Sequence, residues 1–407
     1  MIYLKVKKYK MSSSIQLPRD VYGTEEHQML RETVLEFYKT EVEPHREEWE
    51  ENTACSREAW LKAGELGLLG LTLDPKYGGS GLDFSYSAVA IETFAQTGAD
   101  SPGISMHSDI VIPYIEKHGS EAIKDKYLPK MNTGECIGSL GMTEPSTGSD
   151  VQAIRTTAVD QGDHYLVNGS KTFITIGYTS DFTLTACKTE NGISLIIIDA
   201  DMEGFTKGKP FKKLGLKTSD TCELFFDNVK VPKGNLIGEE GKGFVHMMQE
   251  LPRERLTIAI QAIGAVRGGL ELTTAYTQER TAFKQPICAF QNTQFKLAEV
   301  ATQLEINTAF VDKCTELLAR KELTPELASM AKYASTEMQG KMLDECLQLF
   351  GGYGYMWEYP ITRMVADARV SRIYGGTNEI MKLMIARAIF SDYFKEMKAK
   401  RRAKVNG

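Results

Sequence analysis

Hydrophobic residues in the first third of the chain recur with the 3.6-residue period of an amphipathic helix. Between residues 24 and 42 the apolar positions share one helical face, and Pro44 ends the run. The same period returns in four further segments, which are Arg57–Leu66, Tyr86–Thr97, Ser105–His118 and Glu121–Met131. The pattern therefore predicts an all-helical N-terminal domain over residues 24–135.

Near Cys136 the pattern changes to short, β-branched runs that are typical of strands. Two Asn-Gly pairs, Asn168-Gly169 and Asn191-Gly192, stand between such runs and predict hairpin turns. The expected strands are Tyr165–Val167, Thr172–Thr175, Phe182–Cys187, Ile193–Ile198, Leu224–Phe226 and Val229–Val231. Residues 136–243 should therefore form a separate antiparallel β domain.

Helical periodicity returns after Gly243 and predicts a C-terminal domain over residues 244–393. A short helix, Phe244–Glu250, should end before Pro252, because proline suits the first turn of the next helix, which runs to about Arg280. Apolar positions nearly encircle this second helix, so it should be the buried member of a bundle. The other expected helices are Gln294–Arg320, Pro325–Phe350, Pro360–Tyr374 and Asn378–Tyr393. Strands and helices do not alternate, which predicts an α+β fold without a doubly wound sheet.

Composition and charge narrow the choice of partners. The chain has 407 residues, of which 42% are hydrophobic and 25% charged, and its net charge is −6. An acidic surface argues against general binding of nucleic acid or anionic membranes, and no apolar run reaches the ~18 residues of a membrane span. Residues 1–23 form an N-terminal extension without a recognisable signal or transit peptide, and residues 394–407 form a basic, solvated tail. We therefore expect a cytoplasmic protein, or a mitochondrial matrix protein if the chain is eukaryotic.

Several common chemistries lack their sequence signatures. The seven cysteines include no CxxC pair and the six histidines no pair at metal-ligand spacing, so we expect reduced thiols and no metal site. No GxGxxG follows a strand, and neither a phosphate loop nor a GxSxG motif is present. Catalysis is left to carboxylates and a bound cofactor.

Five segments of unusual composition follow one another along the chain. Each alone is explained by an ordinary turn or strand. They are Leu140-Gly-Met-Thr-Glu-Pro-Ser-Thr-Gly-Ser-Asp150, Lys171-Thr-Phe-Ile-Thr175, Arg280-Thr-Ala-Phe-Lys-Gln-Pro-Ile287, Gln348-Leu-Phe-Gly-Gly-Tyr-Gly354 and Arg372-Ile-Tyr-Gly-Gly-Thr-Asn-Glu-Ile380. In this order, within a helix–strand–helix chain, they closely resemble the acyl-CoA dehydrogenase family of flavoproteins, most of all its long-chain group.

The resemblance covers residues 24–393 and implies an N-terminal helical domain, a middle antiparallel β-barrel and a C-terminal helical bundle. It implies FAD between the β domain and the C-terminal helices, in a homotetramer built as a dimer of dimers. The implied cofactor-binding residues are Leu140, Met142, Thr143, Ser149, Phe173, Ile174, Thr175, Arg280, Phe283, Gln291, Gln348, Gly351, Gly352, Thr377, Asn378 and Glu379. Of these, Arg280, Phe283, Gln291 and Gln348–Gly352 would reach the FAD of a neighbouring subunit.

By the same resemblance, Ser149, Arg255 and Gly376 would contact the CoA part of the substrate. The sequence departs from the family pattern at Ile176, where Asn is frequent, at Lys284, where Gly is usual, and at Ser146-Thr147, where Gly-Ala is common.

The resemblance also implies where the catalytic base lies. Most members carry a Glu where this sequence has Gly375, which should leave free space beside the reacting carbon and offer its N–H to the thioester carbonyl. In the long-chain and isovaleryl-type groups the base comes from the buried helix, where this sequence has Glu254. Burial would raise the pKa of Glu254, opposed by the nearby helix N-terminus. The alternatives are that Glu254 only complements that helix dipole, or that Glu379 is the base.

The expected activity is FAD-dependent α,β-dehydrogenation of medium- or long-chain acyl-CoA thioesters to trans-2-enoyl-CoA. Electrons would pass to an electron-transferring flavoprotein. Alternatives on the same fold are a branched-chain enzyme for citronellyl- or isovaleryl-like thioesters and an acyl-CoA oxidase. A flavin-bearing DNA-protective protein is disfavoured by the net charge of −6, and a flavin-free structural homologue is the remaining alternative.

Overall fold

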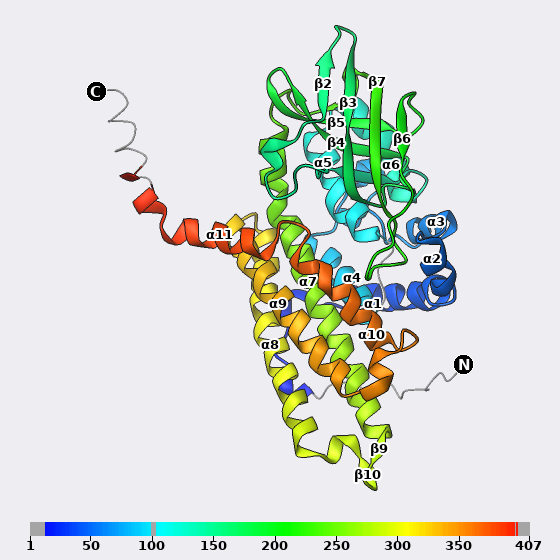
Figure 1. The fold of residues 1–407 in the computed structure, drawn as a ribbon, viewed down its shortest axis with the longest axis vertical. Coiled ribbons are helices and arrows are strands. Elements are labelled where there is room, and N and C mark those ends of the chain that lie inside the picture. Colours follow the sequence, from blue (N-terminus) through cyan, green and yellow to red (C-terminus); the bar gives the residue numbers. More distant parts are fainter. Residues whose placement is uncertain (1–12, 99–102, 395, 398–407) are drawn as a thin grey trace.

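The computed structural model describes residues 13–98, 103–394 and 396–397. It consists of an N-terminal helical part, a β-sheet part and a C-terminal helical bundle (Figure 1), which confirms the α+β prediction. Among the helices in these ranges, none is long and apolar enough to cross a membrane. Residues 1–12 of the expected extension and nearly all of the expected basic tail lie outside the described residues.

Within the described residues the N-terminal part contains six α-helices; five lie close to the predicted segments, and the helix Arg46–Asn52 was not predicted. One π-helical turn, Tyr38–Val42, follows α1, and another, Met106–Val111, directly precedes α5. Serine or threonine side chains cap α1, α3 and α6, as expected for residues that accept a bond from an N-terminal N–H. The helices are α1 (Glu25–Phe37), α2 (Arg46–Asn52), α3 (Arg57–Glu65), α4 (Phe84–Gln96), α5 (Ile112–His118) and α6 (Glu121–Thr133).

The middle part is one eight-stranded sheet with the order β6-β7-β3-β2-β4-β5-β8, in which β1 pairs with β4. Its strands are β1 (Gly138–Gly141), β2 (Thr157–Asp160), β3 (His164–Thr175), β4 (Phe182–Thr189), β5 (Gly192–Asp199), β6 (Phe205–Lys207), β7 (Thr221–Pro232) and β8 (Leu236–Ile237). The prediction of purely antiparallel pairing is wrong, because β1 and β2 both run parallel to β4. β3 intervenes in the chain between β2 and β4 and supplies the crossover that parallel neighbours require.

The two Asn-Gly pairs have different roles. Asn191-Gly192 lies at the β4–β5 hairpin, so that prediction is confirmed. Asn168-Gly169 lies inside β3, where the pairing with β7 shifts register, so the predicted turn there is wrong. A side chain on Gly169 would stand 2.6 Å from the Thr156 hydroxyl, and its φ is +146°. This glycine therefore permits a bulge and a close approach of two chain segments.

The C-terminal part is a bundle around one long helix, α7. Its helices are α7 (Gly243–Glu279), α8 (Gln291–Ala319), α9 (Pro325–Gln348), α10 (Pro360–Ala368) and α11 (Asn378–Ile389), with a small hairpin of β9 (Thr281–Ala282) and β10 (Gln285–Pro286). The predicted break before Pro252 is wrong, because α7 continues through it. Proline removes one backbone hydrogen bond, and the fully buried Met247 and Leu256 on either side hold the helix together.

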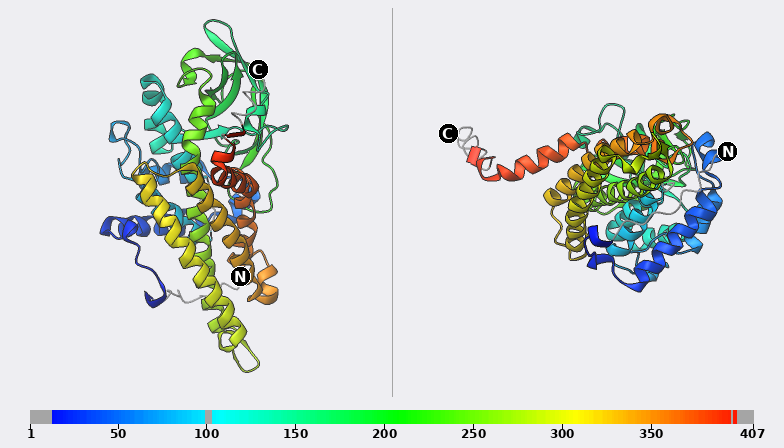
Figure 2. Two further views of the ribbon diagram at one scale, coloured as in Figure 1. Left: turned by 90° about the vertical axis from the view of Figure 1, so that its left-hand side faces the viewer. Right: turned by 90° about the horizontal axis from the view of Figure 1, so that it is seen from below.

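The core joins helices from both ends of the sequence. One hydrophobic cluster contains residues of α4, α7, α8, α9 and α10, and α7 runs through the middle of the molecule (Figure 2). On α7, a side chain at Gly264 would stand 2.3 Å from the Glu92 carbonyl, and one at Gly268 would stand 2.0 Å from the Gln96 carbonyl. These two glycines let α4 lie directly on α7, so α4 packs as part of the C-terminal bundle.

Residues 13–23 are also part of the fold and not a detached extension. Tyr22 is 7% exposed and lies in the main cluster. The Arg19 guanidinium donates to both oxygens of Asp312 at 2.7 and 2.6 Å and to Glu92 at 2.6 Å. Glu92 also accepts from Arg267 at 3.2 Å. Ion pairs between distant segments leave no periodic signal, and therefore the sequence did not reveal this attachment.

Candidate active site

A buried carboxylate lies in the interior of α7. Glu254 is 7% exposed, and its Oε1 accepts a hydrogen bond from the Tyr114 hydroxyl of α5 at 2.9 Å. Burial raises the pKa of Glu254 to about 7; the bond from Tyr114 and the charge of Arg255 oppose this shift, and the charge of Glu250 adds to it. The direction agrees with the sequence argument. The expected opposing helix N-terminus is absent, because α7 begins at Gly243, about three turns earlier.

The glycine loop before α11 lies directly against this part of α7. Gly375 and Gly376 have φ angles of +62° and +87°. A Cβ at Gly375 would stand 2.5 Å from Cδ1 of Ile258, which is one helical turn after Glu254. The Gly375 loop therefore packs on α7 one helical turn from Glu254. The expected free space beside Gly375 is not present, because Ile258 fills it, and a side chain there would also be strained.

A buried lysine holds this loop in place. Lys332 of α9 is fully buried, and its Nζ donates to the Gly376 carbonyl at 2.8 Å and to Oδ1 of Asn378 at 3.0 Å. Burial, with a contribution from Arg255, lowers the pKa of Lys332 to about 8. The Asn378 amide in turn donates to Thr336 and Glu337. Asn378 was expected to contact the cofactor, but its side chain holds the loop and is 1% exposed.

The neighbouring Arg255 points away from Glu254. It is 5% exposed, and its Nη1 donates to the Ser329 hydroxyl of α9 at 3.2 Å. This direction follows from the 100° rotation per residue in a helix. Arg255 was expected to contact CoA, whereas the structure places it between α7 and α9.

The two β-domain segments lie together and are held by a buried ion pair. Lys171 is fully buried, and its Nζ donates to Glu144 at 2.8 Å and to the Met142 carbonyl at 3.2 Å. Glu144 also accepts from two backbone N–H groups, those of Arg155 and Thr156. These bonds fix the segment that follows β1. The expected cofactor contacts Leu140, Met142, Thr143 and Ser149 are all partly or fully exposed.

Side chains along β3 point alternately to the two faces of the sheet, so the three expected cofactor contacts on this strand do not share one face. Phe173 is 65% exposed with a φ of +59°, and Thr175 is partly exposed. Ile174 is 2% exposed and packs inside the sheet core, so only its backbone faces the site. An exposed aromatic ring beside a hydroxyl suits a flat, polar-edged cofactor such as a flavin.

The second group of expected cofactor residues lies at the opposite end of the molecule. Arg280 follows the last turn of α7, and Phe283 in the β9–β10 turn is 91% exposed. A side chain at Gly351 or Gly352 would meet no atom within 4 Å. The helix α7, about 55 Å long for its 37 residues, separates this tip from the β domain (Figure 1). One chain therefore presents the two groups at different places.

Two of the three departures from the family pattern have left-handed backbones. Ile176 has a φ of +52° and Lys284 a φ of +66°. Asn and Gly adopt this conformation at less cost than β-branched or long side chains do. The structure thus explains why Asn and Gly suit these two positions.

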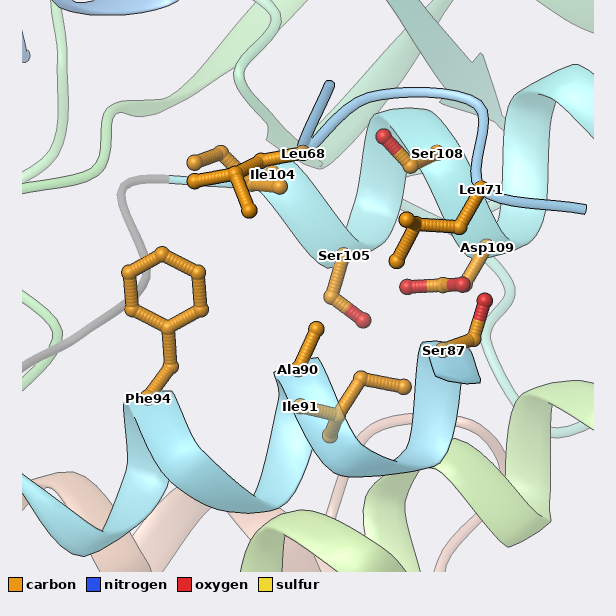
Figure 3. Close-up of a pocket in the computed structure, with 10 residues that line it drawn as sticks. All are labelled: Leu68, Leu71, Ser87, Ala90, Ile91, Phe94, Ile104, Ser105, Ser108 and Asp109. Carbon is orange, nitrogen blue, oxygen red and sulfur yellow. The ribbon is translucent and has the colours of Figure 1, made fainter. Parts of the chain in front are cut away.

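A small cavity lies between α4 and the π-helical turn before α5. Its volume is about 20 Å³, which is room for one water. Figure 3 shows the carboxyl of Asp109 and the hydroxyls of Ser87, Ser105 and Ser108 around it. Asp109 also lies 3.8 Å from Arg253, the residue before Glu254. The remaining lining residues are Leu68, Leu71, Ala90, Ile91, Phe94 and Ile104.

Two functional residues carried no recognisable sequence signal. Tyr114 and Lys332 belong to no motif, and each acts on a segment more than 40 residues away. The only hint was a polar group on an otherwise apolar helix face, which is too common to be informative.

The candidate site therefore combines a buried carboxyl group with a pKa near 7 and a glycine loop that packs on the same helix one turn later. Models of the acyl-CoA dehydrogenase N-terminal, middle and C-terminal domains match residues 24–135, 139–229 and 241–390. The chain belongs to the acyl-CoA dehydrogenase family and is a flavin-dependent oxidoreductase.

Relatives of known name are similar in sequence to most of this chain. The mitochondrial long-chain specific acyl-CoA dehydrogenase of Mus musculus is 48% identical over 374 residues, covering 90% of this chain and 87% of the relative. The crystal structure of an acyl-CoA dehydrogenase from Geobacillus kaustophilus is 46% identical with a TM-score of 0.88, covering 90% and 99%. An acyl-CoA dehydrogenase from Bacillus anthracis, solved with FAD, is 32% identical with a TM-score of 0.87, covering 95% and 70%.

Proposed function

We propose that this chain converts medium- or long-chain acyl-CoA thioesters to trans-2-enoyl-CoA with Glu254 as the base. The observation that carries the proposal is the buried Glu254 carboxyl. Its pKa is about 7, and it lies one helical turn from the point where the Gly375 loop packs on α7. A base with this pKa is about half charged at neutral pH, so it can both take and release a proton there. FAD, the cofactor of the family, supplies the acceptor for the β-hydride when bound.

The protein's own groups would prepare the α-proton for removal. Tyr114 orients the Glu254 carboxyl through its hydrogen bond, and burial keeps bulk water from the carboxyl. We assign the backbone N–H of Gly375 to the thioester carbonyl, which gains negative charge as the proton leaves. Lys332 holds the backbone of this loop against α9. The carbonyl donor would therefore be in place before the substrate arrives.

We assign the cofactor site to two surfaces. In one subunit the β-domain side chains and the start of α11 would meet the flavin and nearby atoms; these are Leu140, Met142, Thr143, Ser149, Phe173, Thr175, Thr377 and Glu379. Ile174 would contribute its backbone only, since its side chain lies in the sheet core. Ser149 and Gly376 would also meet the CoA moiety. We exclude Arg255 and the Asn378 side chain, which are engaged within the bundle.

The distant tip supports a homotetramer in which a neighbouring subunit completes each FAD site. Its proposed contacts are Arg280, Phe283, Gln291, Gln348, Gly351 and Gly352. The tip exposes Phe283 and Tyr355 at 91% and 84%, and α11 also exposes apolar side chains where it projects from the body (Figure 2). Light scattering of the purified holoenzyme tests the assembly: a tetramer of the 45.4 kDa chain is expected, and a monomer that retains FAD would contradict it.

The Glu254→Gln variant tests the base. We expect it to keep the yellow colour of bound FAD and to lose turnover at least a thousandfold, because glutamine accepts no proton at neutral pH. Glu47→Gln, on the exposed face of α2, is the matched control and should turn over normally. Near-normal turnover of the Glu254 variant would refute the assignment.

Substrate, acceptor and location require separate measurements. Rates over acyl-CoA thioesters of graded length should peak at medium or long straight chains; a peak at citronellyl- or isovaleryl-CoA would make it a branched-chain enzyme. Turnover should depend on an electron-transferring flavoprotein under both aerobic and anaerobic conditions, whereas an oxidase would need only O₂. The cytoplasmic location remains a prediction that cell fractionation tests.

A further inference from the structure

Two helices carry matched polar residues beside the base. On α7, Glu250 precedes Glu254 by one turn, and on α5, Tyr114 precedes His118 by one turn. The Tyr114 hydroxyl donates to Glu254 at 2.9 Å, and His118 Nε2 lies 3.3 Å from Oε1 of Glu250. Lys117 Nζ donates to Oε2 of Glu250 at 2.7 Å. Each of the two glutamates of α7 therefore has a polar partner on α5.

A second imidazole, that of His246, packs against His118 on the side away from Tyr114. The ring of His246, one turn before Glu250, stacks on His118 with centroids 4.2 Å apart. Gly238 covers the other side, where a Cβ would stand 2.2 Å from the His246 ring. Burial lowers the pKa of His246, and the neighbouring His118 lowers it further. The stacked pair therefore disfavours two charges, and Lys117 forms an ion pair with Glu250 at 2.7 Å.

The two glutamates repel each other when both are charged, and their partners stabilise the charge on Glu250 more than the charge on Glu254. Glu250 and Glu254 are 3% and 7% exposed and one helical turn apart, so each disfavours the charge of the other. Glu250 has an ammonium and an imidazole as partners. Among the described residues, the hydrogen-bond partner of the Glu254 carboxyl is a neutral phenol. The negative charge therefore resides on Glu250 first, and Glu254 is the carboxyl that exchanges a proton near neutral pH.

We propose that Tyr114 and Glu250 are positioning residues that set the proton affinity of Glu254 in opposite directions. The phenol stabilises the charged carboxylate of Glu254, and the Glu250 charge stabilises its protonated form. Arg255 also acts on the pKa of Glu254, which it lowers, but its side chain leaves α7 about 100° away and donates to Ser329. The inference rests on the proposed role of Glu254 as the base.

The test compares Tyr114→Phe and Glu250→Gln holoenzymes with the unchanged protein. We expect the pH midpoint of kcat/KM to rise by about one pH unit in Tyr114→Phe, which loses one hydrogen bond to a charged group. In Glu250→Gln the midpoint should fall, since a neighbouring negative charge is removed. Tyr127→Phe is the control, because the hydroxyl of this tyrosine donates to Asp199 on β5 and not to a glutamate of α7; its midpoint should not move.

A second readout does not need turnover. The infrared band of the protonated Glu254 carboxyl, identified as the band missing in Glu254→Gln, should titrate with the same shifts in the substrate-free protein. Unchanged midpoints, or shifts in one direction for both variants, would overturn the inference while an inactive Glu254→Gln upholds the base. If Glu250→Gln does not fold, Tyr114→Phe decides alone, because it removes a single oxygen atom and no upward shift would overturn the inference.

Discussion

Replacing Glu254 with glutamine should stabilise the folded protein above neutral pH, although it removes the proposed base. Glu254 is 7% exposed, and burial raises its pKa to about 7 from an ordinary value of 4.5. Above that pH the folded protein carries a carboxylate in an apolar interior, whereas the unfolded chain solvates it. Glutamine keeps the shape and the oxygen that accepts from Tyr114, and it carries no charge at any pH.

The size of the effect follows from the pKa. The interval from 4.5 to about 7, at about 1.4 kcal/mol for each pH unit, corresponds to about 3 kcal/mol. Because the folded-state pKa is the higher one, the unmodified protein has its full stability below pH 4.5. It loses this contribution as the pH rises through 7. The variant should therefore match the unmodified protein near pH 4.5 and exceed it by about 3 kcal/mol at pH 8.

Urea denaturation of both holoproteins between pH 5 and 8, followed by tryptophan fluorescence, measures this difference. Glu47→Gln controls for the loss of one negative charge, because Glu47 is exposed on α2. Its denaturation curve should follow that of the unmodified protein at each pH. If the difference between Glu254→Gln and the unmodified protein were the same at pH 5 and pH 8, the Glu254 carboxyl would not have the raised pKa, and the argument for the base would fail.

Three further substitutions test close packing at two glycines and backbone strain at one lysine. Gly375→Ala should lower turnover at least tenfold while FAD remains bound, because its Cβ would meet Ile258 at 2.5 Å; Ile258→Ala in the same chain should restore part of the rate. Gly268→Ala should destabilise the protein by more than ~2 kcal/mol in thermal unfolding, and Gly234→Ala, with no atom within 4 Å, by less than ~0.5 kcal/mol. Lys284→Gly should raise the free energy of unfolding by up to ~1 kcal/mol in the same assay, since it relieves a φ of +66°.

Local pattern predicted most of the elements. A 3.6-residue or two-residue period reports which faces of a segment meet a core, so the N-terminal helices, the β4–β5 hairpin and the long bundle helices are readable from the chain. The segments around Leu140, Phe173 and Tyr374 carry recognisable composition, and they led to the family and to its FAD. Glu254 was identified in the same way, from its place in a familiar segment beside a glycine that lacks a carboxylate.

Features that depend on distant partners were not readable. Pro252 is a helix breaker by local rules, yet packing on both sides keeps α7 continuous and places Glu254 in its interior. Gly169 resembles a turn residue, but its neighbour Thr156 comes from another segment. The parallel pairing of β1 and β2 with β4 and the attachment of Arg19 to α4 and α8 likewise arise only when the chain is folded.

The sequence by itself determined which segments are helices and strands, to which family the chain belongs, and which carboxylate lies on the buried helix. The tertiary structure decided what surrounds that carboxylate. Burial, the phenol of Tyr114 and the charge of Glu250 act on its pKa, and a lysine of α9 holds the nearby glycine loop. Periodicity is a property of neighbouring residues, whereas burial and electrostatic interaction depend on distances through space. Only folding sets those distances.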